Sequence, residues 1–146
     1  MLVKRKLSFF TNSWTIITKI LLKDTHRTRV YIIHNNQAIV VKDRLGDGSW
    51  KLPGGGMKKG EKPKECAARE IYEELRIKVD LKDLVFLETV KPTEHLPFYK
   101  EILKVTLKEK PDIKINKLEL SDARWFDIKE LPEIGDEVIN QSIKII

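Results

Sequence analysis

The feature that most constrains this chain is a glycine-rich turn that runs directly into a predicted helix carrying several glutamates, over residues 55–77. Glu70, Glu73 and Glu74 are spaced i, i+3 and i+4, so a helix places their carboxylates within about a 100° arc of one face. Like charges crowded in this way repel one another, and a hard divalent cation with oxygen ligands would relieve the repulsion. The spacing therefore predicts a metal-binding face, with a merely solvated acidic surface as the alternative.

The opposite side of the same predicted helix is apolar. Ala67, Ile71 and Leu75 follow one another at i, i+4 and i+8, the spacing of a helix side that packs on a core. Pro63 is compatible with the first helical turn, and we expect the helix to end near Leu75. The buried side would then hold the acidic side in a fixed position.

This stretch resembles the signature of the Nudix hydrolase family, G-x5-E-x7-R-E-U-x-E-E-x-G-U, in which U is an aliphatic residue. Gly55, Glu61, the run Arg69-Glu70-Ile71-Tyr72-Glu73-Glu74 and Ile77 all fall at the spacing of the signature. One position departs from it, because Arg76 stands where the signature has glycine. Glycine would ease a left-handed turn there, so the departure concerns the exit from the helix and removes no carboxylate. The chain is identified as a member of this family.

The resemblance implies a function for the acidic face. Glu73 and Glu74 are expected to be metal ligands, and Glu70 is expected to be either a ligand or the base that activates water. The expected cofactor is Mg²⁺, with Mn²⁺ as a substitute. Bound to these carboxylates, the metal would neutralise the charge of two phosphates and align the attacking water.

Three other signature positions also receive roles from the resemblance. Arg69 would form an ion pair that orients a glutamate, Gly55 would offer its carbonyl oxygen to the metal, and Glu61 would support the junction between loop and helix. From spacing alone, Arg69 and Glu73 could equally be an ordinary i, i+4 surface pair worth about 0.3–0.5 kcal/mol.

Members of the family often carry a further glutamate six residues before the tryptophan of the last core strand. Trp125 has Glu119 at that offset, so the resemblance makes Glu119 a candidate for an additional ligand or a water-activating base. Asp122 and Glu94 are rival candidates. Trp125 and the adjoining Phe126 are expected to belong to the core.

Length and composition fit one domain spanning residues 1–146, with 41% hydrophobic and 34% charged residues. No apolar run reaches about 18 residues, so no membrane span is expected. The basic start, interrupted by Thr11, Asn12 and Ser13, does not resemble a secretory signal. Cys66 is the only cysteine, which fits a reducing cytoplasm and a residue that simply packs within the helix.

The net charge is +6, from 28 basic and 22 acidic residues. A basic surface attracts polyanions, including nucleotides and RNA, although the basic residues are scattered and form no RNA-binding motif. The excess therefore favours a phosphate-rich substrate, with an RNA 5′ end as one candidate. A homodimer is an open alternative to a monomer.

The remaining pattern predicts a mixed α/β fold. Strands are expected at 27–34 and 38–42 as a hairpin, then at 84–90, 98–107 and 123–127, with a helical turn at 128–131. Residues 108–118 are expected to form a charged loop, and Asp136 to cap a terminal helix over 136–146. Residues 1–25 form an N-terminal extension or a first strand or helix, within which 14–22 fits either. Together with the central loop–helix–loop motif, this is the α/β/α sandwich that the Nudix resemblance implies.

The leading functional hypothesis is a Mg²⁺-dependent pyrophosphohydrolase that cleaves the P–O–P bridge of a nucleoside diphosphate linked to another group. A nucleoside triphosphate is the first substrate class, followed by a nucleotide sugar or dinucleotide, and then by the 5′ end of RNA. Two alternatives from other classes are a nucleotide-binding module that does not cleave its ligand and an unrelated α/β domain with an acidic helix.

Overall fold

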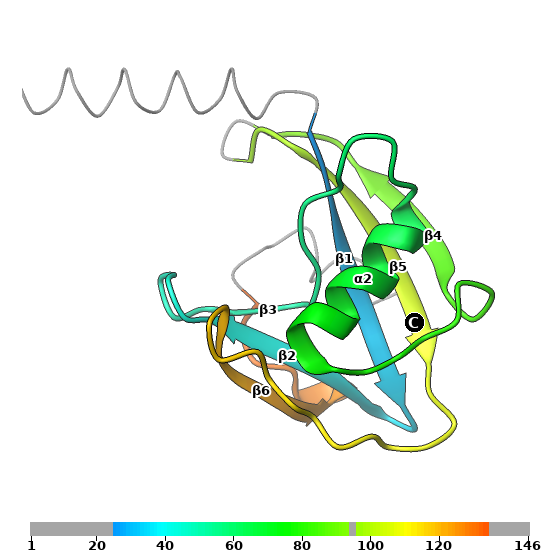
Figure 1. The fold of residues 1–146 in the computed structure, drawn as a ribbon. Coiled ribbons are helices and arrows are strands. Elements are labelled where there is room, and N and C mark those ends of the chain that lie inside the picture. The colour runs from blue at the N-terminus through cyan, green and yellow to red at the C-terminus, as the bar shows by residue number, and fades with distance from the viewer. Residues whose placement is uncertain (1–24, 94–95, 135–146) are drawn as a thin grey trace, which may run out of the picture.

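The computed structural model describes residues 25–93 and 96–134, which form a mixed sheet with one α-helix against its face (Figure 1). This confirms the expected α/β class. The predicted segments at 14–22 and 136–146 lie outside the described residues, so the expected second helical layer of the sandwich stays a prediction. Among the described residues, no helix is both long and apolar enough to cross a membrane. In chain order the elements are β1 (His26–His34), β2 (Gln37–Asp43), β3 (Trp50–Lys51), α2 (Pro63–Leu75), β4 (Val85–Val90), β5 (Tyr99–Thr106), β6 (Leu120–Asp127) and the 3₁₀ turn η1 (Ile128–Glu130).

The sheet runs in the order β3-β2-β1-β5-β4, and β6 pairs with β2. Strands β1 and β5 are parallel over eight residue pairs, while β4 runs antiparallel to β5. The predicted hairpin of β1 and β2 is confirmed, and Asn35 takes a left-handed φ of 52° in its turn. Asparagine tolerates this conformation better than most residues.

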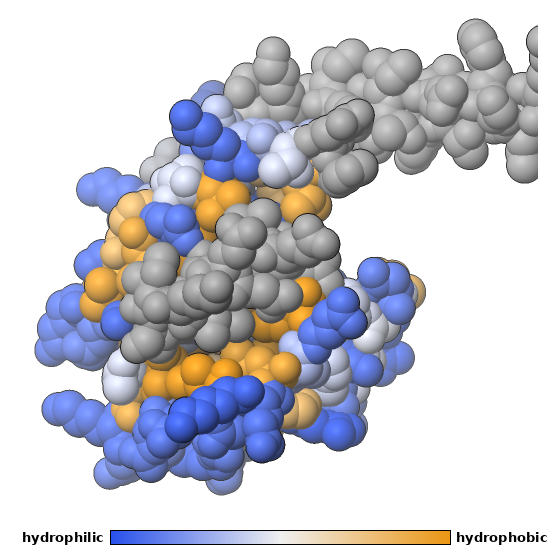
Figure 2. Space-filling view, turned by 180° about the vertical axis from the view of Figure 1, so that it is seen from behind, coloured by the Kyte–Doolittle hydropathy of each residue, from blue (hydrophilic) through white to orange (hydrophobic). Residues whose placement is uncertain are grey.

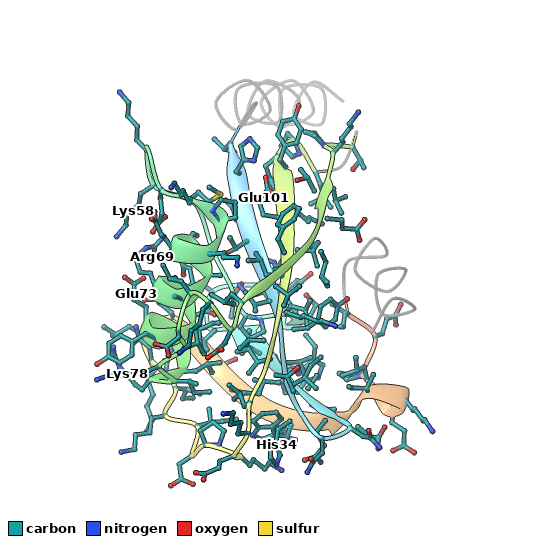
Figure 3. The ribbon with its side chains drawn as sticks, turned by 90° about the vertical axis from the view of Figure 1, so that its right-hand side faces the viewer. His34, Lys58, Arg69, Glu73, Lys78 and Glu101 are labelled. Atoms are coloured by element: carbon teal, nitrogen blue, oxygen red, sulfur yellow. The ribbon has the colours of Figure 1, made fainter. Side chains whose placement is uncertain are left out.

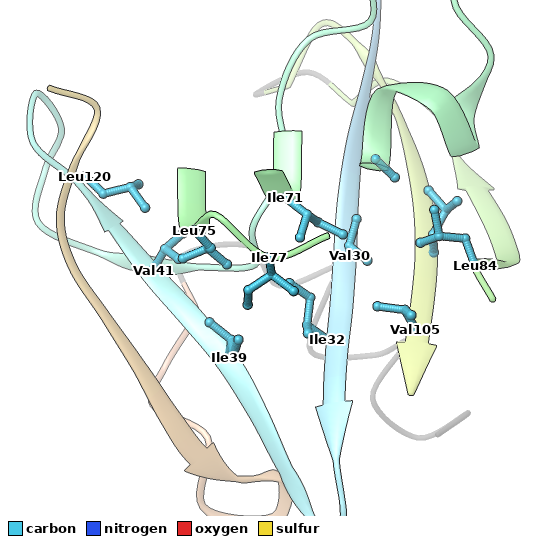
Figure 4. Close-up of a cluster of buried hydrophobic side chains, with 12 residues drawn as sticks. Val30, Ile32, Ile39, Val41, Ile71, Leu75, Ile77, Leu84, Val105 and Leu120 are labelled. Carbon is cyan, nitrogen blue, oxygen red and sulfur yellow. The ribbon is translucent and has the colours of Figure 1, made fainter. Parts of the chain in front are cut away.

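β1 and β2 pair only next to their turn and then diverge, as Figure 4 shows. The glycine-rich loop pairs with the free edge of β1 in the opening. The amide nitrogen of Val30 donates to the Pro53 carbonyl oxygen, and that of Thr28 donates to the Gly55 carbonyl oxygen, each over 2.9 Å. Because β1 lacks a β2 partner there, these bonds satisfy backbone groups that would otherwise be exposed. They also fix the loop that precedes α2.

The apolar side of α2 packs on the sheet as the spacing predicted. Ala67, Ile71 and Leu75 are fully buried and belong to a core cluster that includes Val30 and Ile32 of β1 (Figure 4). Burying such aliphatic side chains stabilises the fold by about 1.5–3 kcal/mol each before entropy losses are counted. The acidic side of α2 is therefore held by a rigid attachment to β1, β2 and β5.

A second cluster lies on the sheet face away from α2. It includes Tyr31, Val40, Leu52, Ile102 and Ile134, each 1% exposed or less. Figure 2 shows this side of the molecule, where apolar residues gather between hydrophilic ones. The alternation of side chains along β1 explains the two clusters: Val30 and Ile32 point to the face that α2 covers, and Tyr31 points to the other face.

The exit from α2 adopts the left-handed turn that the family's glycine would ease, although the residue here is arginine. Arg76 has φ 60° and ψ 23°, and its amide nitrogen donates to the Tyr72 carbonyl oxygen over 3.0 Å. Its guanidinium carbon lies 5.3 Å from the centre of the Tyr72 ring. The departure from the signature thus leaves the exit geometry in place at some conformational cost.

The last strand differs in length from the prediction. β6 begins at Leu120 rather than at Ala123, because it pairs with β2 along its whole length. A bulge between Lys42 and Asp43 brings Leu120 opposite Asp43. Consequently Glu119 directly precedes a strand and is not part of a free loop. The loop over 108–118, the strands at 85–90 and 99–106 and the turn at 128–130 agree with the predictions to within a few residues.

Candidate active site

A cleft of about 350 Å³ lies where α2, the glycine-rich loop, β1 and the approach to β6 meet. Both signs of charge line it. The acidic residues on its wall are Asp43, Glu70, Glu74 and Glu119, and the basic residues are Arg27, Arg29 and Lys51. The three consecutive glycines Gly54, Gly55 and Gly56 complete the wall between them.

Glu74 is the most buried of the helix carboxylates, with only 3% of the residue exposed. Its Oε2 accepts a hydrogen bond from the Gly54 amide nitrogen over 2.9 Å, which fixes the carboxylate against the loop. Burial raises the pKa of Glu74 to about 7, because the charged form loses solvation, while the bond from Gly54 works in the opposite direction.

Glu70 explains why position 55 is a glycine. A Cβ atom on Gly55 would lie only 2.5 Å from the Glu70 carboxylate, well inside van der Waals contact. Gly54 is required for a different reason, since its φ is 135° and a Cβ there would lie 2.3 Å from the Thr28 carbonyl oxygen. The loop can therefore approach both the helix and β1 only because these side chains are missing.

Arg69 lies on the outer side of α2 beside Glu73 (Figure 3) and donates hydrogen bonds to three glutamates. It donates two hydrogen bonds to Glu61, from Nε to Oε1 over 2.7 Å and from Nη2 to Oε2 over 2.9 Å. Its Nη1 also donates to Glu70 over 2.6 Å and to Glu73 over 3.0 Å. The pKa of Glu61 falls to about 2, chiefly through the bonds from Arg69. The Arg69–Glu73 contact is thus one part of a network that joins the loop to the helix, and not an isolated surface pair.

The three glycine carbonyl oxygens of residues 54–56 each accept a hydrogen bond from a different donor. Arg29 Nη1 donates to the first over 3.0 Å, the Thr28 amide nitrogen to the second over 2.9 Å, and Arg69 Nη2 to the third over 3.0 Å. A carbonyl oxygen has two lone pairs. The Gly55 carbonyl oxygen also accepts long hydrogen bonds from the Thr28 hydroxyl over 3.5 Å and from the Cys66 thiol over 3.7 Å, so the expected metal contact would have to displace these two donors.

Glu119 lines the cleft with Glu70 and Glu74, at the position that the tryptophan offset indicated. Asn116 holds it there. The Asn116 amide nitrogen donates to the Glu74 carbonyl oxygen, and its Nδ2 donates to Glu119 Oε1, each over 2.8 Å. Of the two rivals, Asp122 forms an ion pair with Arg124 over 2.7 Å, and Glu94 lies outside the described residues.

The structure brings Gly55, Glu70, Glu74 and Glu119 to one cleft but leaves Glu73 off its wall, with 41% of that side chain exposed. Across residues 25–93 and 96–134, no three acidic, histidine or cysteine side chains are already gathered as a metal-binding group.

Sequence reasoning missed the basic wall. Its only signal was Arg27 and Arg29 at i, i+2 in a strand that is otherwise rich in apolar residues. The remaining basic residue of the wall, Lys51, is bonded to Asp43 over 2.6 Å.

Comparison with known proteins decides the family. The family profile described as "NUDIX domain" matches residues 24–144. The chain belongs to the Nudix family. Curated relatives of this Nudix chain include proteins named RNA pyrophosphohydrolase. One from Bartonella clarridgeiae is 33% identical over 106 residues, which cover 58% of this chain and 60% of the relative. One from Psychromonas ingrahamii is 42% identical over 57 residues, which cover 38% and 32%. These alignments thus span less than two thirds of either relative.

Solved structures of the same family share the fold of this Nudix chain. A MutT NUDIX hydrolase from Burkholderia pseudomallei matches with a TM-score of 0.71 at 17% identity, over 84% of this chain and 97% of that one. A dihydroneopterin triphosphate pyrophosphohydrolase from E. coli matches with a TM-score of 0.67 at 19% identity, over 85% and 97%. At these identities the likeness establishes the fold.

Proposed function

We propose that this Nudix chain is a divalent-metal-dependent pyrophosphohydrolase that cleaves the P–O–P bridge of a nucleotide-linked diphosphate. One observation carries the proposal: Glu70 and Glu74, both nearly buried, line a cleft that Arg27, Arg29 and Lys51 also line. Carboxylates would attract a cation to this cleft, and the basic residues would attract phosphate.

The residues of the cleft fit Mg²⁺ in chemistry. Carboxylate oxygens are its preferred protein ligands, and it commonly takes one or two of them together with water and substrate phosphate. Glu70 and Glu74 would hold the ion, and Glu119, which lines the same cleft, would supply a further carboxylate oxygen. Once bound, the ion would neutralise phosphate charge and lower the pKa of a coordinated water.

The chain's own contribution is to hold these carboxylates in place. The Gly54 amide fixes Glu74, and Arg69 fixes Glu70 while tying it to the loop through Glu61. Arg69 Nη1 donates to Glu73 as well as to Glu70, so Glu73 can turn toward the cleft only after its hydrogen bond with Arg69 breaks. Glu70 and Glu119 both remain candidates for the base that takes a proton from the attacking water.

The substrate we favour is the 5′-triphosphate end of RNA, which the sequence alone places third, after a nucleoside triphosphate and a nucleotide sugar or dinucleotide. Two observations support RNA as the first choice of substrate: the curated relatives are named RNA pyrophosphohydrolase, and the net charge of +6 favours a polyanion. A free nucleoside triphosphate presents the same phosphate chain to the cleft and is the direct competitor.

A substrate panel tests the proposal. The full chain is incubated with 5′-triphosphorylated RNA, GTP, a nucleotide sugar and a dinucleoside tetraphosphate, with Mg²⁺ or with EDTA, and the products are identified by mass. We expect Mg²⁺-dependent release of pyrophosphate or phosphate from the RNA at the highest kcat/KM. E70Q and E74Q should each lower kcat by at least about a hundredfold, because each removes a charge that faces the metal.

E109Q provides a matched control, since Glu109 is an exposed residue of the charged loop. It should behave like the parent. E73Q tests whether Glu73 joins the metal site, since a large loss of kcat would show that it leaves Arg69 during the reaction. The absence of cleavage of any member of the panel under Mg²⁺ or Mn²⁺ would refute the hydrolase and favour a binding module.

A further inference from the structure

Arg29 differs from the other two basic residues of the cleft in how its charge is held. Lys51 is bonded to the Asp43 carboxylate over 2.6 Å, and the Arg27 guanidinium stacks 4.6 Å from the centre of the Phe98 ring. Arg29 instead donates to two neutral acceptors, the carbonyl oxygens of Thr28 and Gly54, each over 3.0 Å. Within the described residues, it is the cation of this cleft that touches neither a carboxylate nor an aromatic ring.

Both bonds of Arg29 come from one nitrogen, Nη1. A guanidinium has five N–H groups in a rigid planar fork, so three remain at Nε and Nη2. The described part of the chain offers these three no hydrogen-bond acceptor, although the residue is only 9% exposed and lines the cleft. These N–H groups are not sealed from solvent, so they can exchange water for an anionic ligand that enters the cleft.

The charge of Arg29 is balanced at longer range by the acidic wall. Glu74 and Glu70 both act on it electrostatically, as does Asp43. A divalent cation held by Glu70 and Glu74 would cancel their negative charge and leave Arg29 as an excess positive charge beside it. The side chain cannot swing away, because its Nη1 is fixed to the strand and to the loop.

We infer that Arg29 is a substrate-binding residue whose free N–H groups hold a non-bridging phosphate oxygen beside the metal-binding carboxylates. The inference rests on the proposed function for the location of the phosphates. The rigid fork matches the geometry of phosphate oxygens, which a lysine at the same position would not. In fixing the Gly54 carbonyl and the substrate at once, Arg29 sets the distance between the phosphate and the loop that orients Glu74.

Calorimetric titration with inorganic pyrophosphate in the presence of Mg²⁺ tests this without any turnover. R29Q should weaken pyrophosphate binding about tenfold or more, the size expected for a lost charge-assisted hydrogen bond. R29K keeps the charge but loses the fork, and should weaken binding by an intermediate factor. R124Q is the matched control, because Arg124 lies outside the cleft with 64% of its side chain exposed, and it should bind within about twofold of the parent.

A second measurement separates binding from a purely structural role. Mn²⁺ affinity, measured by electron paramagnetic resonance without pyrophosphate, should be equal or higher in R29Q, because a positive charge near the carboxylates has been removed. A fall in Mn²⁺ affinity would mean that Arg29 acts by shaping the loop, and would overturn the inference. If circular dichroism shows that R29Q does not fold, R29K decides.

Three outcomes of the titration contradict the inference: R29Q binds pyrophosphate like the parent, R124Q weakens binding as much as R29Q does, or the parent does not bind pyrophosphate at all. The proposed function fails separately. If Arg29 holds pyrophosphate but the parent hydrolyses nothing in the panel, only the hydrolase is refuted. If the parent hydrolyses RNA while R29Q binds pyrophosphate normally, only the role of Arg29 is refuted.

Discussion

Replacing Gly55 by alanine should damage the candidate active site far more than it damages the fold. The added Cβ would lie 2.5 Å from the Glu70 carboxylate, whereas ordinary contacts begin at 3.4 Å, so one of the two groups must move by about 0.9 Å. The loop backbone at Gly55 is held by the Thr28 amide, and the Glu70 carboxylate is held by Arg69 over 2.6 Å. The carboxylate is the freer of the two, since it ends a flexible side chain.

A displacement of about 1 Å in a catalytic group can lower a rate by about a hundredfold, and we expect that loss of kcat for G55A. Overpacking should cost about 1–3 kcal/mol of stability, so the protein should still fold. The assay pairs Mg²⁺-dependent turnover of the best substrate with thermal unfolding, both at the same pH.

The neighbouring glycines provide the comparison. A Cβ on Gly56 would meet nothing within 4 Å, so G56A should retain at least about ten times the activity of G55A. Gly54 has φ 135° and no room beside Thr28, so G54A should fail to fold stably. If G55A turned over substrate as fast as the parent while remaining folded, the role of the Glu70 position would be refuted.

Three further predictions concern residues around the cleft. E74Q should be more stable than the parent by about 1–3 kcal/mol at pH 8 in metal-free buffer, and this gain should disappear below about pH 4.5. The reason is that the folded-state pKa of Glu74 is raised to about 7, so the parent loses stability as the pH rises from about 4.5 through 7. Urea unfolding at several pH values measures this, and a gain that does not change with pH would mean that Glu74 is solvated. R76G should be more stable than R76A by about 0.5–1 kcal/mol, because both lose the contact with Tyr72 but only glycine relieves the left-handed conformation, and equal unfolding midpoints would argue against strain at this position. N116A should lower kcat about as much as E119Q does, because the Asn116 side chain donates the hydrogen bond that holds Glu119 at the cleft. The double variant should then lower kcat little further. Additive losses in a double-mutant cycle would show that the two residues act separately.

The parts of the fold that sequence reasoning predicted are those that local pattern determines. The spacing of Ala67, Ile71 and Leu75 marked the buried side of α2 because a helix repeats every 3.6 residues whatever it packs against. The hairpin was readable for the same kind of reason, since a polar turn separated two apolar segments. The start of β6 was misplaced because it depends on pairing with β2, a contact far away in the sequence.

The candidate site shows the same division. Helical spacing predicted that Glu70, Glu73 and Glu74 lie on one side of the helix. It did not predict that Arg69 would hydrogen-bond Glu73 and hold it on the outer side, away from the cleft. The burial of Arg29 could not be predicted from the sequence, because it depends on the separation of β1 from β2 and on the glycine-rich loop that packs between them. Such positions depend on tertiary packing that no local period reveals.

The central claim is that Glu70 and Glu74 bind a divalent cation at the cleft, and a Mn²⁺ titration followed by electron paramagnetic resonance tests it most directly. The parent and the exposed-site control E109Q should bind Mn²⁺ with the same affinity, while E70Q and E74Q should each bind it about tenfold or more weakly. Equal Mn²⁺ affinity in all four proteins would contradict the account, because the ion would then lie elsewhere on the chain.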